Sequence, residues 1–133
     1  MRRDRALALA RVAAGIVFLV FGIGKFTAHA SEVDSFHKYG LPEPDATVYA
    51  IGVVEVVGGI LLILGFLTWF AALVLAGDMF VAIIVSGIKE GEVVPSLTLA
   101  PVLLVIMLAL MRFGPGAPAL DATRPPPGET RSA

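Results

Sequence analysis

Four long apolar blocks restrict what this chain can fold into more than any other feature of its sequence. They occupy residues 6–26, 48–67, 69–88 and 93–111, and each is about 20 residues long. A helix of 20 residues is about 30 Å long, which is close to the thickness of the hydrocarbon core of a bilayer. We therefore predict four transmembrane helices that form a bundle.

A soluble bundle of four buried helices is the alternative, and it would need polar outer faces at a spacing of 3.6 residues. Residues 60–64, with the sequence ILLIL, leave no such face. Hydrophobic residues make up 57% of the chain and charged residues 16%, outside the usual range of soluble domains. The sequence therefore favours an all-α membrane protein.

The residue types exclude several kinds of site. The chain has no cysteine, so iron–sulfur clusters, disulfides and covalent haem attachment have no ligand within it. Its two histidines, His29 and His37, match no known spacing of zinc ligands, and we interpret them as interfacial or solvated residues. Ten basic and eleven acidic residues give no field that would attract nucleic acid. We expect no metal site and no covalent cofactor.

The basic residues that flank the blocks predict the orientation. Seven arginines lie near the two ends of the membrane region: Arg2, Arg3, Arg5, Arg11, Arg112, Arg124 and Arg131. The loops after the first and third blocks hold only Lys25, Lys38 and Lys89. Because basic flanks remain in the cytoplasm, we predict that both termini are cytoplasmic, which agrees with an even number of spans.

Two short motifs lie between the first and second blocks. Ala28-His29-Ala30 has the form of a cleavage site, so a cleaved signal peptide is an alternative for the first block, although the block is long for one and Lys25 precedes the site. Residues 31–34 fit a capping box, and Gly40 would end the helix that follows. We expect a short helix on the outer surface.

The membrane region is expected to end near residue 112. Pro101 should kink the fourth block or end its first turn. Beyond the block, residues 113–133 are rich in proline and have too little apolar surface to fold. We therefore divide the chain into a transmembrane domain, residues 1–112, and a flexible cytoplasmic tail, residues 113–133.

Four ionisable residues fall within the apolar blocks or at their edges: Arg11, Lys25, Glu55 and Asp78. Each charge near a helix centre costs about 2.5–3.5 kcal/mol, so pairing or burial in a polar cavity is expected. Their depths along the helices favour pairing of Lys25 with Glu55 and of Arg11 with Asp78. Snorkelling to the interfaces is an alternative for the two basic residues. The two acids either hold helices together, or they bind a ligand or pass protons.

Glycines share faces with these charges. In the first block, Gly15 and Gly22 lie on the same stripe as Arg11 and Lys25. The second block has further small residues on the side of Glu55: Gly52, Gly58, Gly59 and Gly65. Such stripes let helices approach closely in a membrane, so we predict that they pack helices together and that Glu55 faces the bundle interior.

Several motifs follow one another along the chain: Arg11-x3-Gly15 to Gly22-x2-Lys25; Phe36, Gly40 and Pro42; and Glu55-x2-Gly58-Gly59 to Gly65-x2-Thr68, with Ala71-Ala72 and Met79-x2-Ala82. Their order and spacing resemble those of the DoxX family of small four-span membrane proteins. The resemblance covers residues 6–112. It implies a multi-pass protein of the bacterial inner membrane in a redox setting, with Arg11, Lys25 and Glu55 as functional positions.

Three functions remain open at this point. The first is a subunit of a quinone-linked or detoxifying redox system, in which Lys25 and Glu55 line a site for a quinone head group. It would work with other redox proteins, as a single copy or a homo-oligomer, because the chain is not expected to be a self-sufficient enzyme. The second is a factor that assembles or stabilises membrane proteins through its glycine stripes. The third is a small carrier or proton pathway.

Overall fold

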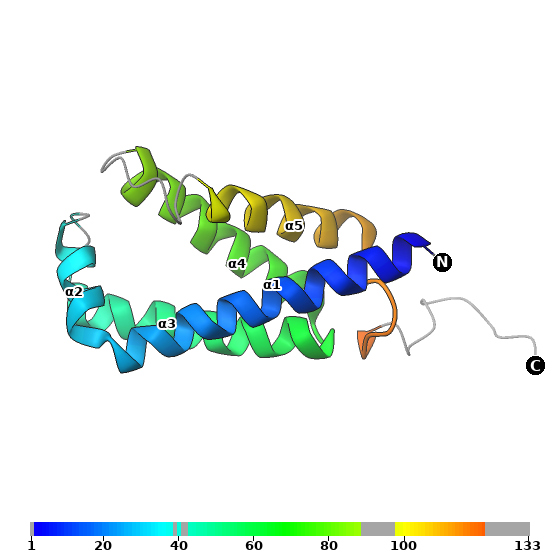
Figure 1. Cartoon of the computed structure of the whole chain (residues 1–133), viewed down its shortest axis with the longest axis horizontal. Helices are drawn as coiled ribbons and strands as arrows, with labels where there is room; N and C mark the ends of the chain where they lie inside the picture. The colour runs from blue at the N-terminus through cyan, green and yellow to red at the C-terminus, as the bar shows by residue number, and fades with distance from the viewer. Residues whose placement is uncertain (1, 39, 41–42, 89–97, 122–133) are drawn as a thin grey trace, which may run out of the picture.

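The computed structural model describes residues 2–38, 40, 43–88 and 98–121 (Figure 1). Within these ranges, the chain consists of helices and the connections between them, so the predicted all-α class is confirmed. The elements are α1 (Arg2–Thr27), α2 (His29–Lys38), α3 (Pro44–Leu64), α4 (Thr68–Ala82), a π-helical segment η1 (Ile83–Ile88) and α5 (Leu99–Phe113).

Three helical stretches are long and apolar enough to cross a membrane, namely α1, α3 and Thr68–Val85. Their outer surfaces are apolar, as the exposed fractions of Leu9 (73%) and Phe70 (63%) illustrate. Such surfaces suit a lipid solvent, because they would be costly in water. The fourth predicted block is represented by α5, which is apolar but has only 15 residues. Residues 93–97 of that block lie outside the described residues, so the count of four spans and the side of the termini stay predictions.

Glycines bring α1 and α3 into direct backbone contact. The two helices run antiparallel (Figure 1), since Gly15 lies against Gly59 while Gly22 lies against Gly52 and Val56. A Cβ atom added to Gly59 would lie 2.7 Å from the carbonyl oxygen of Gly15. No other residue type leaves this space free, so the glycines of the two predicted stripes fix the distance between the helices.

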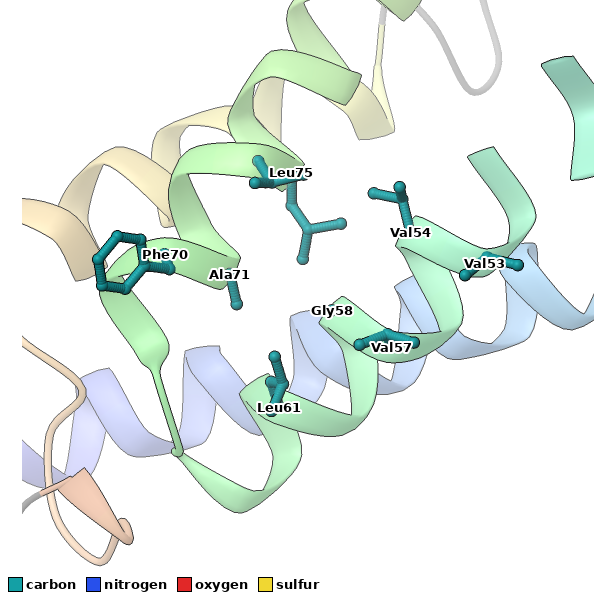
Figure 2. Close-up of a pocket in the computed structure, with 9 residues that line it drawn as sticks. Val53, Val54, Val57, Gly58, Leu61, Phe70, Ala71 and Leu75 are labelled. Carbon is teal, nitrogen blue, oxygen red and sulfur yellow. The ribbon is translucent and has the colours of Figure 1, made fainter. Parts of the chain in front are cut away.

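An open apolar groove of about 290 Å³ lies between α3 and α4 (Figure 2). Figure 2 shows Gly58 and Leu61 on α3 facing Ala71 and Leu75 on α4 across it. The remaining lining is also apolar: Val53, Val54, Val57, Phe70 and Val74. Gly58 contributes no side chain, and a Cβ atom there would lie 2.9 Å from a Leu75 methyl group. The groove therefore narrows at Gly58 and opens toward the outer, apolar surface.

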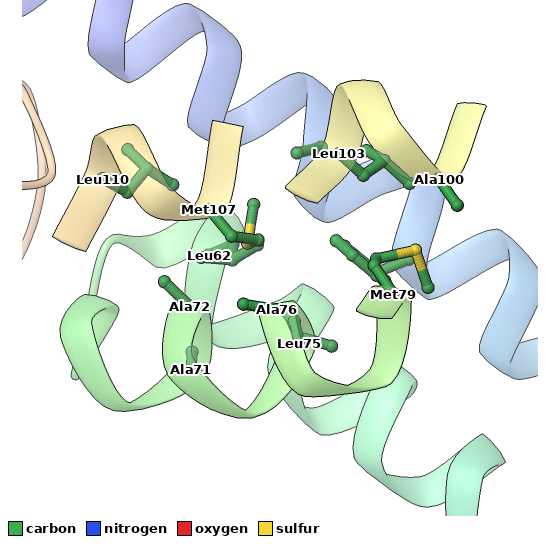
Figure 3. Close-up of a cluster of buried hydrophobic side chains, with 12 residues drawn as sticks. Leu62, Ala71, Ala72, Leu75, Ala76, Met79, Ala100, Leu103, Met107 and Leu110 are labelled. Atoms are coloured by element: carbon green, nitrogen blue, oxygen red, sulfur yellow. The ribbon is translucent and has the colours of Figure 1, made fainter. Parts of the chain in front are cut away.

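The buried core joins α4 and α5 to the α1–α3 pair (Figure 3). Helix α4 contributes small side chains such as Ala72 and Ala76 to this cluster, and α5 contributes larger ones such as Leu103 and Met107. The fully buried Phe18 and Leu62 extend the cluster to α1 and α3. Alternating small and large residues allow this interdigitation, which excludes empty space.

The helix α2 lies across the ends of α1 and α3 (Figure 1). It begins at His29, two residues before the predicted capping box. Backbone hydrogen bonds from Ala28 to the Gly24 carbonyl and from Glu32 to the Ala28 carbonyl continue the helical pattern across the junction, so the helix needs no side-chain cap at Ser31. Gly40 follows with a φ of 77°, as expected for a residue that ends a helix.

Residues 114–121, which we call the strap, return from α5 to the ends of α1 and α3. The Ala117 amide donates to the Asp4 carbonyl oxygen at 3.3 Å, and the Asp121 amide donates to the Gly65 carbonyl oxygen at 2.8 Å. This differs from the expected flexible tail, because backbone and side-chain hydrogen bonds hold the strap despite its low apolar content. The proline triplet at 125–127 lies outside the described residues.

Candidate functional site

Lys25, Glu55 and Asp78 lie together inside the bundle, and we call them the polar triad. The Lys25 Nζ atom is 2.8 Å from Glu55 Oε1, and both side chains are more than nine-tenths buried. This is the ion pair that helical depth predicted, and Glu55 faces the interior as expected. Both groups are removed from lipid, so snorkelling does not apply to Lys25.

The close approach of α1 and α3 creates this ion pair. Lys25 lies in the last turn of α1, and a Cβ atom on Gly52 would lie only 3.1 Å from the Lys25 Cβ atom. Glu55 follows Gly52 by three residues and therefore lies on the same face of α3. The glycine lets the lysine side chain cross α3 and reach the carboxylate.

Asp78 reaches the same site from α4. Its carboxyl group lies within hydrogen-bonding range of the Glu55 carboxyl group and close enough to Lys25 to be influenced by its charge. The predicted pairing of Asp78 with Arg11 is therefore wrong. The prediction matched charges by depth alone, whereas the packing of α4 turns Asp78 toward α3, and Arg11 finds backbone acceptors elsewhere.

The polar triad has unused hydrogen-bonding capacity. Glu55 Oε1 contacts Lys25 only as an ion pair, without the angle of a hydrogen bond, and Asp78 Oδ2 is buried without any hydrogen-bond partner. Two carboxyl groups that hydrogen-bond to each other share a proton. With that proton, the polar triad is neutral overall, because one ammonium balances one carboxylate. It can therefore accept a hydrogen bond at Asp78 and exchange one proton.

An aromatic residue from α2 closes the site at the end of the bundle that carries this helix. The Phe36 ring is buried, and its centroid is 6.0 Å from Lys25 Nζ, within the range of a cation–π contact. The polar triad is therefore built from three helices, because α1, α3 and α4 contribute one ionisable group each. The helix α2 covers it with the Phe36 ring.

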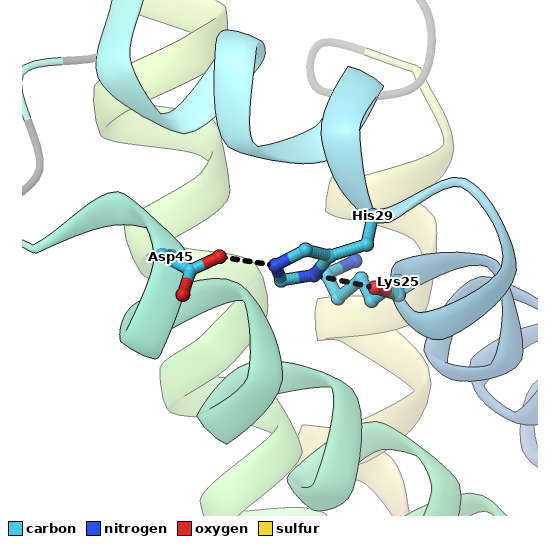
Figure 4. Close-up of polar contacts among 3 residues, drawn as sticks. All are labelled: Lys25, His29 and Asp45. Carbon is cyan, nitrogen blue, oxygen red and sulfur yellow. Dashed lines mark hydrogen bonds and ion pairs between the residues drawn. The ribbon is translucent and has the colours of Figure 1, made fainter.

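His29 links the same ends of α1 and α3 (Figure 4). Its Nε2 atom is 2.5 Å from Asp45 Oδ1, and its Nδ1 atom is 3.1 Å from the Lys25 carbonyl oxygen. Both partners only accept, so both ring nitrogens must donate and the ring is an imidazolium. The hydrogen bond to Asp45 accordingly raises the pKa of His29. The ring also stacks on Tyr49, with centroids 3.9 Å apart.

Arg11 lies at the opposite end of the bundle and outside the polar triad. Its guanidinium group is buried and donates to three backbone carbonyl oxygens, those of Leu62 at 2.7 Å, Pro115 at 2.6 Å and Pro118 at 2.8 Å. It thus joins α1 to the last turn of α3 and to the strap. A cation is favourable at such a helix C-terminus, where carbonyl groups lack helical partners.

Asp121 was not anticipated from the sequence. Its carboxylate accepts hydrogen bonds from the Leu67 amide at 3.0 Å and from the Thr68 amide at 2.8 Å. It therefore caps α4 from a distant part of the chain, which no local motif around Thr68 reveals. The sequence showed only an acid within a proline-rich segment, which does not identify its hydrogen-bond partners.

The predicted glycines serve different purposes. Gly15, Gly22, Gly52 and Gly59 lie in the contact between α1 and α3, whereas Gly58 faces α4. Gly65 ends α3 with a φ of 69° and lies beside Arg11 and Ala119 of the strap, so it makes a turn rather than a helix contact. The role of the four predicted ionisable residues in activity stays a prediction.

Comparisons with known proteins agree on one family. The DoxX family model matches residues 6–87. This range includes α2, α3, α4 and all but the first four residues of α1, and hence all three residues of the polar triad. A curated Bacillus subtilis (strain 168) protein described as "Putative oxidoreductase CatD" is 35% identical over 81 residues. The match covers 61% of this chain and 59% of that relative, which is less than two thirds of its length. No solved structure matches the chain.

Proposed function

Because the chain belongs to the DoxX family, we propose that it is a membrane subunit of a redox system and that its polar triad binds a quinone head group. Its apolar helices make it a multi-pass membrane protein in contact with lipid. We further propose four spans, cytoplasmic termini and a location in the bacterial inner membrane. The name of its Bacillus relative supports the redox setting.

The observation that carries this proposal is the position of the polar triad one helical turn from the apolar groove. Glu55 precedes Gly58 by three residues on α3, and Asp78 follows Leu75 by three residues on α4. Gly58 and Leu75 form the narrow part of the groove. A molecule with a polar head and an apolar tail could place its head at the polar triad and its tail in the groove. Membrane quinones have this structure.

The residues of the polar triad suit a quinone head group chemically. Lys25 would donate a hydrogen bond to a carbonyl oxygen, and the proton shared by Glu55 and Asp78 would be available for transfer to it. A quinone would supply the electron-accepting centre, and electrons would come from a partner protein. The burial of Lys25 and Glu55 excludes water and strengthens each of these interactions.

A binding measurement tests this function. The purified chain in detergent is titrated with a short-tailed benzoquinone, and the dissociation constant is compared with those of Lys25→Met and Asp78→Asn. Because hydrogen bonds that involve charged groups contribute about 1.5–3 kcal/mol, each variant should bind about 10-fold to 150-fold more weakly. Asp34→Asn is the matched control, since Asp34 is an exposed acid on α2.

The result that contradicts the proposal is equally specific. Equal quinone binding by the parent chain, Asp78→Asn and Lys25→Met would exclude the polar triad as the site. Circular dichroism of each variant shows whether its helices are retained, so that loss of binding is not confused with loss of the fold.

The open groove favours a second candidate function, the assembly or stabilisation of other membrane proteins. Its apolar lining and its exposed residues Val57, Phe70 and Val74 also suit a transmembrane helix of a client protein. Deletion of the gene should then lower the amount of particular membrane proteins while the redox activity per remaining molecule is unchanged. A fall in activity per molecule would instead favour the redox subunit.

A further inference from the structure

Four exposed arginines lie at the end of the bundle that carries the strap, and two of them contact one aromatic ring. We call Arg2, Arg3, Arg5 and Arg112 with the ring of Phe113 the arginine patch. The first three residues lie in the first turn of α1 or directly after it, and the other two close α5. All five residues are exposed. None of them contributes to the polar triad or to the core.

The Phe113 ring contacts arginines from two helices, Arg3 on α1 and Arg112 on α5. The Arg3 guanidinium carbon is 5.3 Å from the ring centroid, and that of Arg112 is 5.4 Å from it. Both distances are within the range of cation–π contacts. The hydrogen bond between the strap at Ala117 and the Asp4 carbonyl also ties the strap to the start of α1. Arginines from α1 and α5 are therefore both held beside one ring rather than spread along a flexible segment.

The length of α1 sets the depth of the arginine patch. Its 26 residues extend about 39 Å, whereas the hydrocarbon core of a bilayer is about 30 Å thick. Roughly six residues of α1 must therefore lie beyond the hydrocarbon. The strongly polar end of this helix carries Arg2, Arg3 and Arg5. The residues of α1 that extend beyond the hydrocarbon therefore lie at this end, at the level of the lipid head groups.

Acidic residues do not neutralise this end of the bundle. Among the described residues around the patch, the acids are Asp4 and Asp121. The Asp121 carboxylate accepts two backbone amides at the start of α4, and Asp4 has polar contacts of its own. Four arginines therefore face two acids, which leaves a local excess of positive charge at head-group depth.

We infer that the arginine patch binds the phosphate groups of anionic lipids in the leaflet that surrounds it. Guanidinium groups present paired N–H donors that match phosphate oxygens, and the Phe113 ring holds two of them at this end of the bundle. A zwitterionic lipid also has a phosphate, but its choline group brings a positive charge toward the arginines. The patch thus selects lipids by net charge and fixes the depth of α1 and α5 together.

Counting retained lipids tests this inference. The full chain is purified in neutral detergent and titrated with phosphatidylglycerol or phosphatidylcholine, and bound lipids are counted by native mass spectrometry. We expect tighter retention of phosphatidylglycerol. A basic residue near a membrane surface contributes a factor of about five, so Arg3→Gln with Arg112→Gln should weaken phosphatidylglycerol binding about 30-fold, and Arg112→Gln alone about fivefold.

Lys38→Gln is the matched control for Arg112→Gln, because it removes one exposed positive charge at the other end of the bundle. It should leave retention unchanged. Equal retention of the two lipids, or an equal loss in Lys38→Gln and Arg112→Gln, would overturn the inference. Displacement of phosphatidylglycerol by 10-fold excess inorganic phosphate would also overturn it, because it would indicate a site for a soluble anion. Circular dichroism verifies that the helices are retained in each variant.

Discussion

One methyl group placed between α1 and α3 should destabilise the whole bundle. In Gly59→Ala, the new Cβ atom would lie 2.7 Å from the Gly15 carbonyl oxygen, 2.8 Å from the Leu19 nitrogen and 3.2 Å from the Leu19 Cα atom. All three obstacles are backbone atoms of α1. No side chain can rotate away, so α1 as a whole must move.

Two opposing effects set the magnitude. Overpacking of a tight contact costs about 1–3 kcal/mol, and rigid backbone obstacles favour the upper part of that range. Replacing glycine by alanine inside a helix contributes about 1 kcal/mol in the opposite direction. We therefore expect a net destabilisation of about 1–2 kcal/mol. Displacement of α1 should also lengthen the ion pair between Lys25 and Glu55, which lies one turn from Gly59.

Reversible unfolding of the purified chain in mixed micelles, followed by circular dichroism, measures this effect. Gly24→Ala and Gly77→Ala are the matched controls, because a Cβ atom at either position meets no atom within 4 Å. Both controls should stabilise the bundle by about 0.5–1 kcal/mol through helix propensity alone. Equal stability of Gly59→Ala and Gly24→Ala would refute the idea that the glycine contact sets the distance between the helices.

Three other predictions concern the ends of the bundle. Asp121→Ala should lower the free energy of unfolding by about 0.5–2 kcal/mol, because it removes the cap of α4, and chemical denaturation measures this loss. Arg11→Lys should destabilise the chain by at least about 1.5 kcal/mol, since one ammonium cannot reach all three carbonyl oxygens that the guanidinium binds, and the same measurement applies. Raising the pH should loosen the contact between α2 and α3, because the pKa of His29 is raised by Asp45. The imidazolium stabilises this contact fully below the unfolded pKa of about 6.5, and the stabilisation is lost as the pH rises through the folded pKa. Amide hydrogen exchange of α2, measured as a function of pH, detects this loss.

Each of these predictions has its own control. Asp34→Ala removes an exposed acid that caps no helix start and should leave stability unchanged, so an equal loss in both aspartate variants would contradict the capping role. Faster hydrogen exchange of α5 but not of α1 and α3 in Arg11→Lys would contradict the connection made by Arg11. His29→Gln should abolish the pH dependence of hydrogen exchange in α2, whereas His37→Gln should retain it. A pH dependence that persists in His29→Gln and is lost in His37→Gln would show that another group titrates.

Much of the helical architecture was predictable, because it depends on local properties of the chain. Length and hydropathy placed the apolar blocks, and the bounds of α1 and α3 follow the first two of them closely. The pairing of Lys25 with Glu55 was also predictable, since helical period gives the face of each residue and rise gives its depth. Even the start of α2 was wrong by only two residues, at a junction where backbone hydrogen bonds continue.

The sequence did not predict the interaction partners of Arg11, Asp78 and Asp121. Matching charges by depth paired Arg11 with Asp78, yet Arg11 binds backbone carbonyl oxygens and Asp78 lies beside a second acid. Every residue has a carbonyl and an amide group, so residue types do not reveal which of them remain unpaired at a helix end.

The sequence by itself thus determined the membrane environment, the helices and the ion pair between Lys25 and Glu55, because hydropathy and helical geometry act over a few turns. The tertiary structure alone decided where the strap returns, which helix ends it caps and which acid completes the polar triad. Those choices depend on backbone groups of segments that are distant in the chain and adjacent only after folding.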